Sequence, residues 1–317
     1  MSLVVTGTGG NLGRLVVENL LARGVDPRRI VAGTRDVGGL SALAEQGVDV
    51  RRIDFDDAAS LTAGFAGAEK VLIVSGTDFG RRVEQHVGAA RAARDAGAAL
   101  VAYTSAPYAD TTDLLLAAEH RGTEEGIREL GVPFTFLRNG WYFENYTSQI
   151  PVYLETGVIV GSAGEGRISG AARSDYAEAA AAVLAGEGHE GAVYELGGDT
   201  SFTLPELAEQ VATHSGRPVV YRDVTQAELE AVLTGAGVPA PVAAVLADAD
   251  RAISAGRLLI TTGDLARLIG HPTAPLATAV SAATAVSAAT AVSAAAAVSA
   301  ATTVSAATVS AATSAAS

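Results

Sequence analysis

Thr6-Gly7-Thr8-Gly9-Gly10-Asn11-Leu12-Gly13 follows an apolar run, Leu3-Val4-Val5, and leads into a helical pattern of apolar residues. A strand that ends in a glycine turn and opens a helix directs backbone N–H groups and the positive end of the helix dipole at one point, where a pyrophosphate can bind. Gly7 permits the sharp turn, Gly10 lets the backbone approach a phosphate, and Gly13 lets the helix pack closely on the strand. The stretch therefore predicts a dinucleotide-binding turn, and an inert turn that only caps the helix is the alternative.

Strand-like and helical segments alternate strictly through the first half of the chain. Because the strand-like runs are continuously apolar, this alternation predicts a parallel sheet that helices cover on both faces. Its strands are expected at residues 3–5, 30–35, 48–54, 71–75, 99–103 and 133–137, and the helices between them at 40–46, 58–65, 82–96 and 113–130. The predicted fold class is α/β, a Rossmann-type doubly wound parallel sheet that binds NAD(P) over residues 1–155.

A different pattern begins after residue 155. Short strands and an alanine-rich helix are predicted, at 158–160, 192–196, 219–221 and 174–184. Thr203-Leu204-Pro205-Glu206 and Thr225-Gln226-Ala227-Glu228 both fit the capping box that starts a helix. Residues 156–275 are therefore expected to form a smaller C-terminal α/β portion on the substrate side, partly interleaved with the first domain.

The last stretch, residues 276–317, consists almost entirely of alanine, valine, serine and threonine. Its valines recur about every six residues, which advances a helix by about 600°, so they spread around a helix instead of forming an apolar stripe. No charged residue follows Arg267 to fix a helix by ion pairs. This tail is expected to be disordered, or a marginal helix outside the core.

Composition narrows the function classes. The chain lacks cysteine, which excludes disulfides and thiolate metal sites and makes a reducing cytoplasm the expected location. The formal charge of −13 repels a polyanion, and no basic stripe offsets it, so nucleic-acid binding is not expected. No targeting or membrane-spanning segment is predicted. Nor is a metal site, because metal-ligand spacing is absent from the histidines outside the 113–130 helix, which are His86, His189, His214 and His271.

Residues at the strand ends indicate the cofactor. Thr34 stands where an acidic residue would select NAD, and Arg35 beside it suits the 2′-phosphate of NADPH, although Asp36 leaves NADH open. A solvated surface arginine is the alternative interpretation of Arg35. Asp54-Phe55 can bracket the adenine, and Ser75-Gly76-Thr77 ends the fourth strand at the sheet edge where ligands bind.

The usual catalytic pair of short-chain dehydrogenases, a tyrosine with a lysine four residues later, is absent. The only lysine is Lys70, and arginine cannot replace it because its pKa leaves no proton to relay. In the helix that normally bears the pair, His120 and Glu124 lie one turn apart. They are candidates for an acid and its orienting partner, and a surface histidine with an ordinary i,i+4 contact is the alternative.

An aromatic segment follows the sixth strand, from Leu137 to Tyr146. It contains the only tryptophan, Trp141, and two tyrosines, and its place in the fold brings it beside the nicotinamide end of a bound cofactor. Aromatic faces with a few hydrogen-bond donors suit a flat, conjugated acceptor. An aromatic plug between the two portions is the alternative.

Four stretches together resemble the NmrA-like atypical short-chain dehydrogenases, and within them the type 2 NAD(P)H:quinone oxidoreductase and triphenylmethane reductase group. They are 6–13, 137–146, 173–177 and 268–273, and the similarity spans about residues 2 to 275. The chain departs from the usual turn by having Gly9 where a threonine is common. The resemblance implies an NADPH-binding site made by Gly7, Thr8, Gly9, Gly10, Asn11, Leu12, Arg35, Ser75, Gly76, Thr77, Asn139, Gly140, Trp141, Tyr142, Phe143 and Arg173.

The activity that this resemblance implies is hydride transfer from NADPH directly to a quinone or dye-like acceptor, without flavin or metal. A quinone accepts hydride readily and gives a delocalised oxyanion, which accounts for the missing tyrosine-lysine pair. Tyr142 and His120 are the candidate proton donors. The main alternative is a non-catalytic redox sensor that binds NADP(H) and a partner protein, and an isoflavone-type reductase is disfavoured because it would need a lysine near His120. The oligomeric state stays open, a homodimer included.

Overall fold

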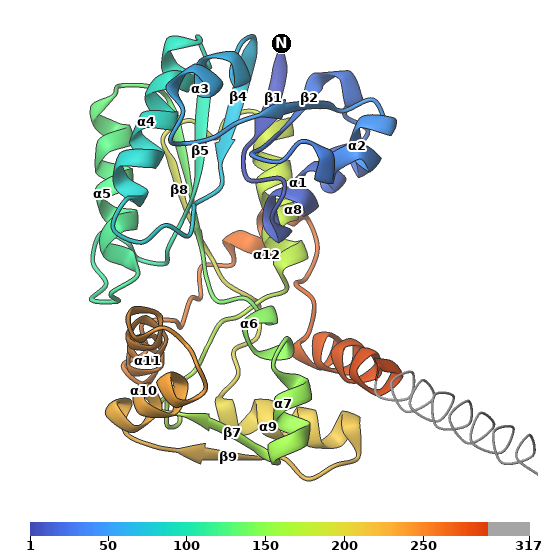
Figure 1. The fold of residues 1–317 in the computed structure, drawn as a ribbon, viewed down its shortest axis with the longest axis vertical. Helices are drawn as coiled ribbons and strands as arrows, with labels where there is room; N and C mark the ends of the chain where they lie inside the picture. Colours follow the sequence, from blue (N-terminus) through green and yellow to red (C-terminus); the bar gives the residue numbers. More distant parts are fainter. Residues whose placement is uncertain (291–317) are drawn as a thin grey trace, which may run out of the picture.

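The computed structural model of the chain describes residues 1–290 (Figure 1). Within these residues, the main sheet has seven parallel strands in the order β3-β2-β1-β4-β5-β6-β8. The order changes direction between β1 and β4, which is the point where doubly wound sheets bind ligands. The strands are β1 (Ser2–Val5), β2 (Ile30–Thr34), β3 (Asp49–Arg52), β4 (Ala68–Ile73), β5 (Leu100–Ser105), β6 (Phe134–Asn139) and β8 (Ala192–Leu196).

Helices cover both faces of this sheet. The helices α1, α8 and α12 pack together on one face, and α3, α4 and α5 lie on the other (Figure 1). Each layer has its own apolar core, one with Leu20 of α1 against α8 and one with Ala89 of α4 against Ile127 of α5. The predicted Rossmann-type fold is confirmed. Its helices are α1 (Asn11–Ala22), α2 (Ser41–Glu45), α3 (Ala58–Gly64), α4 (Arg82–Asp95), α5 (Ala117–Glu129), α8 (Arg173–Ala185) and α12 (Asp264–Ile269), with short 3-10 helices η1 (Pro27–Arg29) and η2 (Gly38–Leu40).

A smaller portion lies below the main sheet in Figure 1 and has its own apolar cluster, which includes Ile159, Leu207 and Ile253. Both predicted capping boxes form, at Thr203 and Thr225. The helix α11 was not predicted from the sequence. The elements here are α6 (Glu144–Thr147), α7 (Ile150–Thr156), β7 (Val158–Gly161), α9 (Leu204–Ser215), β9 (Val220–Asp223), α10 (Gln226–Gly235) and α11 (Ala240–Ser254), with β7 and β9 paired in parallel.

The chain passes between the two portions more than once. Although β8 and α8 come late in the sequence, β8 is the edge strand of the main sheet beside β6, and α8 packs on α1. The short α12 then packs on α8 and β8. Residues from both halves of the sequence therefore line the space between the portions.

The start of the tail differs from the expectation. Residues 276–290 are helical, and Leu276 and Val280 are buried in the cluster of the smaller portion, with Ala279 and Ala283 packed against it. These residues recur at a spacing of three or four, so they share one helix face although the valines alone do not. The rest of the expected tail, residues 291–317, lies outside the described residues.

Val280 and Val286, one repeat apart, provide a direct test of this packing. Val280→Ala is expected to lower the free energy of unfolding by about 1–2 kcal/mol, because Val280 is fully buried. Val286→Ala is expected to change it by less than about 0.5 kcal/mol, because Val286 is 66% exposed. Urea unfolding of the two variants measures the difference, and equal effects would contradict the docking of this helix.

Lys70 is the only lysine in the chain and belongs to β4. Its side chain is buried, and its Nζ donates a hydrogen bond to the carbonyl oxygen of Gly186, just after α8. The ammonium group thus fastens the end of α8 to the sheet. Lys70 is therefore occupied in structure and does not replace the missing catalytic lysine.

Candidate active site

The glycine turn has the geometry that its sequence predicts. Gly7 has a φ of +65°, and the Gly10 N–H donates to the Gly7 carbonyl oxygen at 3.0 Å. A Cβ at Gly13 would lie 2.5 Å from that same oxygen, so only glycine permits this contact. Thr8 ties the turn to β2, because its N–H and its hydroxyl both donate to the Gly33 carbonyl oxygen, at 3.0 and 2.8 Å.

The N-terminus of α1 is left open by this turn. Gly10 is the N-cap residue, no side chain of residues 1–290 caps the helix, and its first turn has no acidic residue. The first N–H groups and the positive end of the helix dipole are therefore available to an anion. Such an end can hold the pyrophosphate of a dinucleotide.

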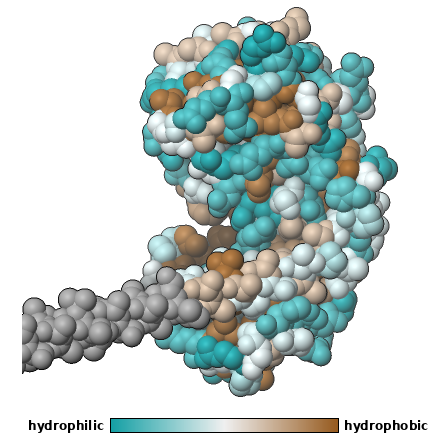
Figure 2. All heavy atoms as spheres, turned by 90° about the vertical axis from the view of Figure 1, so that its right-hand side faces the viewer, coloured by the Kyte–Doolittle hydropathy of each residue, from teal (hydrophilic) through white to brown (hydrophobic). Residues whose placement is uncertain are grey.

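A cleft of about 2080 Å³ opens between the two portions. Figure 2 shows it as a hollow with apolar surface along its lower side. Its walls come from α1, from the loop after β4, from the segment after β6, from the start of α8 and from the 276–290 helix. The predicted cofactor residues that line it are Asn11, Leu12, Ser75, Gly76, Thr77, Asn139, Gly140, Trp141, Tyr142 and Arg173.

The other predicted cofactor residues do not line the cleft. Gly7, Thr8, Gly9 and Gly10 build the turn before α1, and Arg35 is exposed just beyond the end of β2. Beside it, the Asp36 carboxylate accepts a hydrogen bond from the Gly38 N–H at 3.0 Å. This acidic group therefore stabilises the local turn after β2.

Phe143 lies away from the cleft, contrary to the cofactor contact that was expected of it. Its ring is buried in the cluster of the smaller portion, where it meets Phe202 edge-on at 5.8 Å between centroids. Its N–H donates to the Ala171 carbonyl oxygen at 2.9 Å. The residue thus anchors the aromatic segment in this apolar core, where the Tyr146 ring also meets Phe202 edge-on, at 6.0 Å between centroids.

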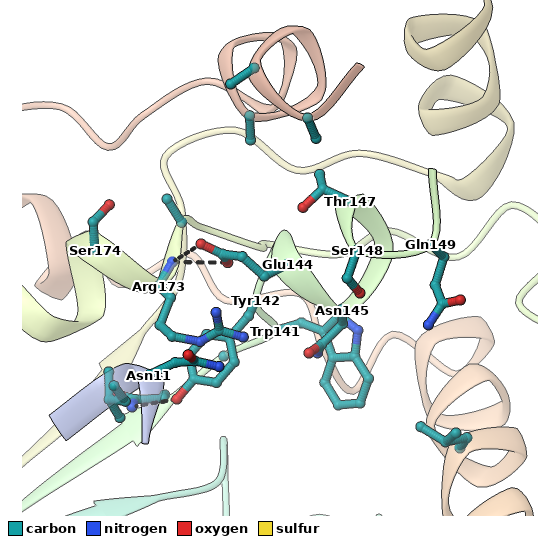
Figure 3. Close-up of a pocket in the computed structure, with 18 of the residues that line it drawn as sticks. Asn11, Trp141, Tyr142, Glu144, Asn145, Thr147, Ser148, Gln149, Arg173 and Ser174 are labelled. Atoms are coloured by element: carbon teal, nitrogen blue, oxygen red, sulfur yellow. Dashed lines mark hydrogen bonds between the residues drawn. The ribbon is translucent and has the colours of Figure 1, made fainter. Parts of the chain in front are cut away.

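Tyr142 is held in the cleft by three neighbours, of which Figure 3 shows Arg173 beside it. The Tyr142 oxygen accepts a hydrogen bond from Asn139 Nδ2 at 3.1 Å, its ring meets Tyr176 edge-on at 5.1 Å, and the Arg173 guanidinium lies 5.2 Å from its centroid. Burial raises the pKa of Tyr142. The hydroxyl is therefore a hydrogen-bond donor that keeps its proton near neutral pH.

His120 lines the cleft but is not the surface histidine of the alternative interpretation. It is 5% exposed, and its Nδ1 lies 2.8 Å from the Tyr103 hydroxyl while its Nε2 lies 3.4 Å from an Arg82 nitrogen. Burial, with a smaller contribution from Arg82, lowers its pKa to about 3. His120 is therefore a neutral imidazole at physiological pH.

The predicted pairing of His120 with Glu124 is wrong. The Glu124 carboxylate instead accepts two hydrogen bonds from Arg138, at 2.9 and 2.7 Å, and one from the Ser105 hydroxyl at 2.7 Å. Arg138 also binds Glu195 at 2.8 Å. His120 and Glu124 lie one turn apart on α5, as predicted. The Glu124 carboxylate binds the buried Arg138 of β6 instead of His120.

The depressed histidine pKa has a consequence for stability against pH. Because the folded pKa of His120 is about 3 and its ordinary value is 6.5, the unfolded chain binds more protons below pH 6.5. Stability is then lost as the pH falls from 6.5 towards 3, by about 1.4 kcal/mol per pH unit once the unfolded histidine is protonated. His86, also buried and with a pKa lowered to about 3, adds the same dependence.

Urea unfolding at pH 7, 6 and 5 measures this dependence. His120→Gln is expected to flatten the loss of stability between pH 6 and pH 5, since one depressed pKa is removed. The matched variant His214→Gln, at an exposed position, is expected to keep the wild-type slope. A wild-type slope in His120→Gln would contradict the neutral, buried state of His120.

Further residues shape the cleft without having been predicted. The Ser75 N–H donates to the Thr104 hydroxyl and the Gly76 N–H donates to His86 Nε2, both at 2.9 Å. The loop after β4 is therefore held in place by side chains of β5 and α4. Glu144 binds the start of α8. These contacts join segments that are distant in sequence. Of the residues involved, only Glu144 could be suspected from the sequence, because it belongs to the aromatic segment.

Three buried polar atoms of the aromatic segment have no hydrogen-bond partner within residues 1–290: Asn139 Oδ1, Trp141 Nε1 and the Tyr146 hydroxyl. Of these residues, Asn139 and Trp141 line the cleft. Buried polar atoms normally find partners, so one acceptor and one donor remain for a ligand or water. In the same part of the chain, no cluster of acidic and histidine side chains is placed to hold a metal, and no helix is long and apolar enough to cross a membrane.

The doubly wound sheet, the open helix end at its switch point and the aromatic cleft define a Rossmann-type dinucleotide-binding protein. A family model supports and narrows this class. Residues 1–255 match the NmrA-like family, and the chain belongs to that family.

Individual relatives are similar over nearly the whole chain. Quinone oxidoreductase 2 of Escherichia coli K12 is 44% identical over 279 residues, which are 88% of this chain and 97% of that protein. The crystal structure of the E. coli NADPH-dependent quinone oxidoreductase complexed with NADPH has a TM-score of 0.85 at 44% identity, covering 88% of this chain and 98% of that one. Citrobacter sp. triphenylmethane reductase complexed with NADP(H) has a TM-score of 0.84 at 39% identity, covering 89% and 100%. The predicted resemblance is confirmed, and the chain is a quinone oxidoreductase-like member of its family.

Proposed function

We propose that this protein transfers hydride from NADPH directly, without flavin, to a quinone or a similar flat conjugated acceptor. The observation that carries the proposal is the single cleft that joins the N-terminus of α1 to the aromatic wall at Trp141 and Tyr142. The 44% identity to an E. coli quinone oxidoreductase supports the reaction type.

NADPH would bind across the switch point of the sheet. The N–H groups at the start of α1 suit its pyrophosphate, and Arg35, at the end of β2, suits its 2′-phosphate. Arg173, Tyr142 and Asn139 line the same cleft as Asn11 of α1, and Figure 3 shows Arg173 and Tyr142 together. Bound there, the nicotinamide supplies two electrons and a hydrogen as hydride.

The acceptor side of the cleft is apolar. Trp141, Leu114 and Leu116 line it and also pack against one another in a small cluster with α11. Phe79 is 46% exposed at the rim. Apolar and aromatic walls can hold a planar ring system close to a nicotinamide, and the chain then contributes proximity and exclusion of water.

Neither candidate proton donor in the cleft is a strong acid. His120 is neutral, and burial raises the pKa of Tyr142, so neither is a strong acid at neutral pH. Reduction of a quinone tolerates this, because the product oxyanion is delocalised and can take its proton from Tyr142 or from water. The lack of a strong acid therefore favours a readily reduced acceptor, such as a quinone, over an ordinary ketone.

Isotope transfer to a triarylmethane dye tests the direct route. Hydride from C4 of NADPH would form a new C–H bond at the central carbon of the dye, a position that does not exchange with water. With C4-deuterated NADPH and flavin-free protein, mass spectrometry is expected to find deuterium in the colourless product. Product that carries only solvent hydrogen would contradict direct transfer, since a flavin N–H exchanges. NADPH binding without turnover of any quinone or dye would favour the redox sensor.

Arg35→Ala tests the cofactor choice. The KM for NADPH with benzoquinone is expected to rise about 10-fold, since one charged contact to the 2′-phosphate is lost. The KM for NADH, which lacks that phosphate, is expected to stay unchanged. Equal effects on both cofactors would contradict the role of Arg35.

A further inference from the structure

The start of α8 is capped by a residue from a distant segment. α8 begins at Arg173, and its N-cap residue, Ala172, has no side-chain oxygen with which to accept an N–H. The two carboxylate oxygens of Glu144 instead accept the Arg173 N–H, both at 3.0 Å (Figure 3). Because Glu144 belongs to the aromatic segment, this bond ties that segment to α8.

The carboxylate of Glu144 binds the backbone of Arg173 and not its side chain. Within residues 1–290 the Arg173 guanidinium has no ion pair, and its contact is the face of the Tyr142 ring at 5.2 Å. A negative charge at a helix N-terminus satisfies its N–H groups and dipole. Glu144 therefore completes the helix end and leaves the cation available in the cleft.

The Tyr142 ring takes its position from the same end of α8. Arg173 lies over one part of the ring, and Tyr176, one turn further along α8, meets it edge-on at 5.1 Å. Asn139 on β6 orients the hydroxyl. A small shift of α8 along the aromatic segment would displace both residues that hold the ring, and the Glu144 bond opposes that shift.

We propose that Glu144 is a positioning residue for NADPH: its cap on α8 places the Arg173 guanidinium over Tyr142, facing a phosphate group of the nucleotide. The inference rests on the proposed function, because it needs NADPH in this cleft. It makes a counterintuitive prediction. A carboxylate in the cleft repels a phosphate, so removal of its charge alone would tighten NADPH binding, whereas loss of the cap weakens it.

Glu144→Ala and Glu144→Gln are compared with the matched variant Glu155→Ala, which removes the same charge from an exposed residue of the same cleft. Glu144→Ala is expected to raise the KM and Kd for NADPH about 10-fold with kcat little changed, because a charge-assisted hydrogen bond is lost. Glu144→Gln keeps one acceptor oxygen, and we expect only about a 3-fold rise. Glu155→Ala is expected to bind NADPH as tightly as wild type or more tightly.

The double variant separates positioning from general loosening of the fold. If Glu144 acts through Arg173, then adding Glu144→Ala to Arg173→Ala is expected to change the Kd by less than about 2-fold, because the two residues form one unit. Tighter or unchanged NADPH binding in Glu144→Ala, or effects of the two substitutions that multiply, would overturn the proposal. Absence of NADPH binding in the wild-type protein would instead refute the proposed function.

Discussion

Gly13→Ala is expected to remove NADPH binding at concentrations where the wild-type protein is saturated. An added Cβ would lie 2.5 Å from the Gly7 carbonyl oxygen and 2.9 Å from that of Thr6, and backbone atoms cannot rotate away as a side chain can. α1 must then move off the turn, at a cost of about 1–3 kcal/mol of stability. Because its N–H groups no longer converge on the pyrophosphate, the affinity is expected to fall about 100-fold or more. Calorimetric titration with NADPH measures it.

Gly88→Ala is the matched control for this variant. Gly88 lies within α4, and apart from its chain neighbours and the nearby backbone of its own helix no heavy atom lies within 4 Å of its ideal Cβ. The substitution is expected to leave NADPH affinity unchanged and to stabilise the helix by up to about 1 kcal/mol. Wild-type affinity in Gly13→Ala would show that the turn before α1 is not the nucleotide site.

Arg138→Met is expected to cost about 3–5 kcal/mol of stability, enough to unfold many proteins of this size. Arg138 is 3% exposed and Glu124 is 1% exposed, so the variant leaves a buried carboxylate whose remaining cation, Arg128, is 3.5 Å away. Glu195, which accepts a hydrogen bond from Arg138 at 2.8 Å, loses this partner too. Chemical denaturation at pH 7 measures the loss.

Two further variants distinguish the effect of leaving the Glu124 carboxylate buried from a general effect of removing an arginine. Arg29→Met breaks a surface pair with Glu69 and is expected to cost less than about 1 kcal/mol. The double variant Arg138→Met with Glu124→Gln is expected to recover part of the loss, since the buried carboxylate is gone. Losses that simply add in the double variant would contradict this account.

The fold was predictable where the signal is local. The alternation of apolar strands and helices and the glycine turn each lie within a short stretch, and the structure has them at nearly the expected positions. The α11 helix was missed because Asp248 and Asp250 interrupt its apolar face. Both are buried and accept backbone N–H groups, from Leu115 and Ser162 at 2.7 Å. The place of β8 at the sheet edge depends on long-range pairing with β6, which no local pattern encodes.

The residues of the candidate site were likewise predictable only where the sequence signal is local. Trp141 and Tyr142 were predictable because they adjoin a strand end, and strand ends of a parallel sheet meet at one edge. Side-chain direction was not predictable: Phe143, next in sequence, turns into the core, and Glu124 makes its shortest ion pair with Arg138 of β6, at 2.7 Å, rather than a contact with His120. Glu144 caps a helix that begins far along the chain, and such a partner is visible only in three dimensions.

The single lysine gives the protein an unusual chemical handle. Since the Lys70 ammonium group is buried against the end of α8, a side-chain amine becomes accessible only when α8 separates from the sheet. Acylating reagents that attack amines would therefore label this side chain at a rate set by opening of the molecule. The extent of labelling at Lys70, read from one peptide by mass spectrometry, would report how often that layer opens.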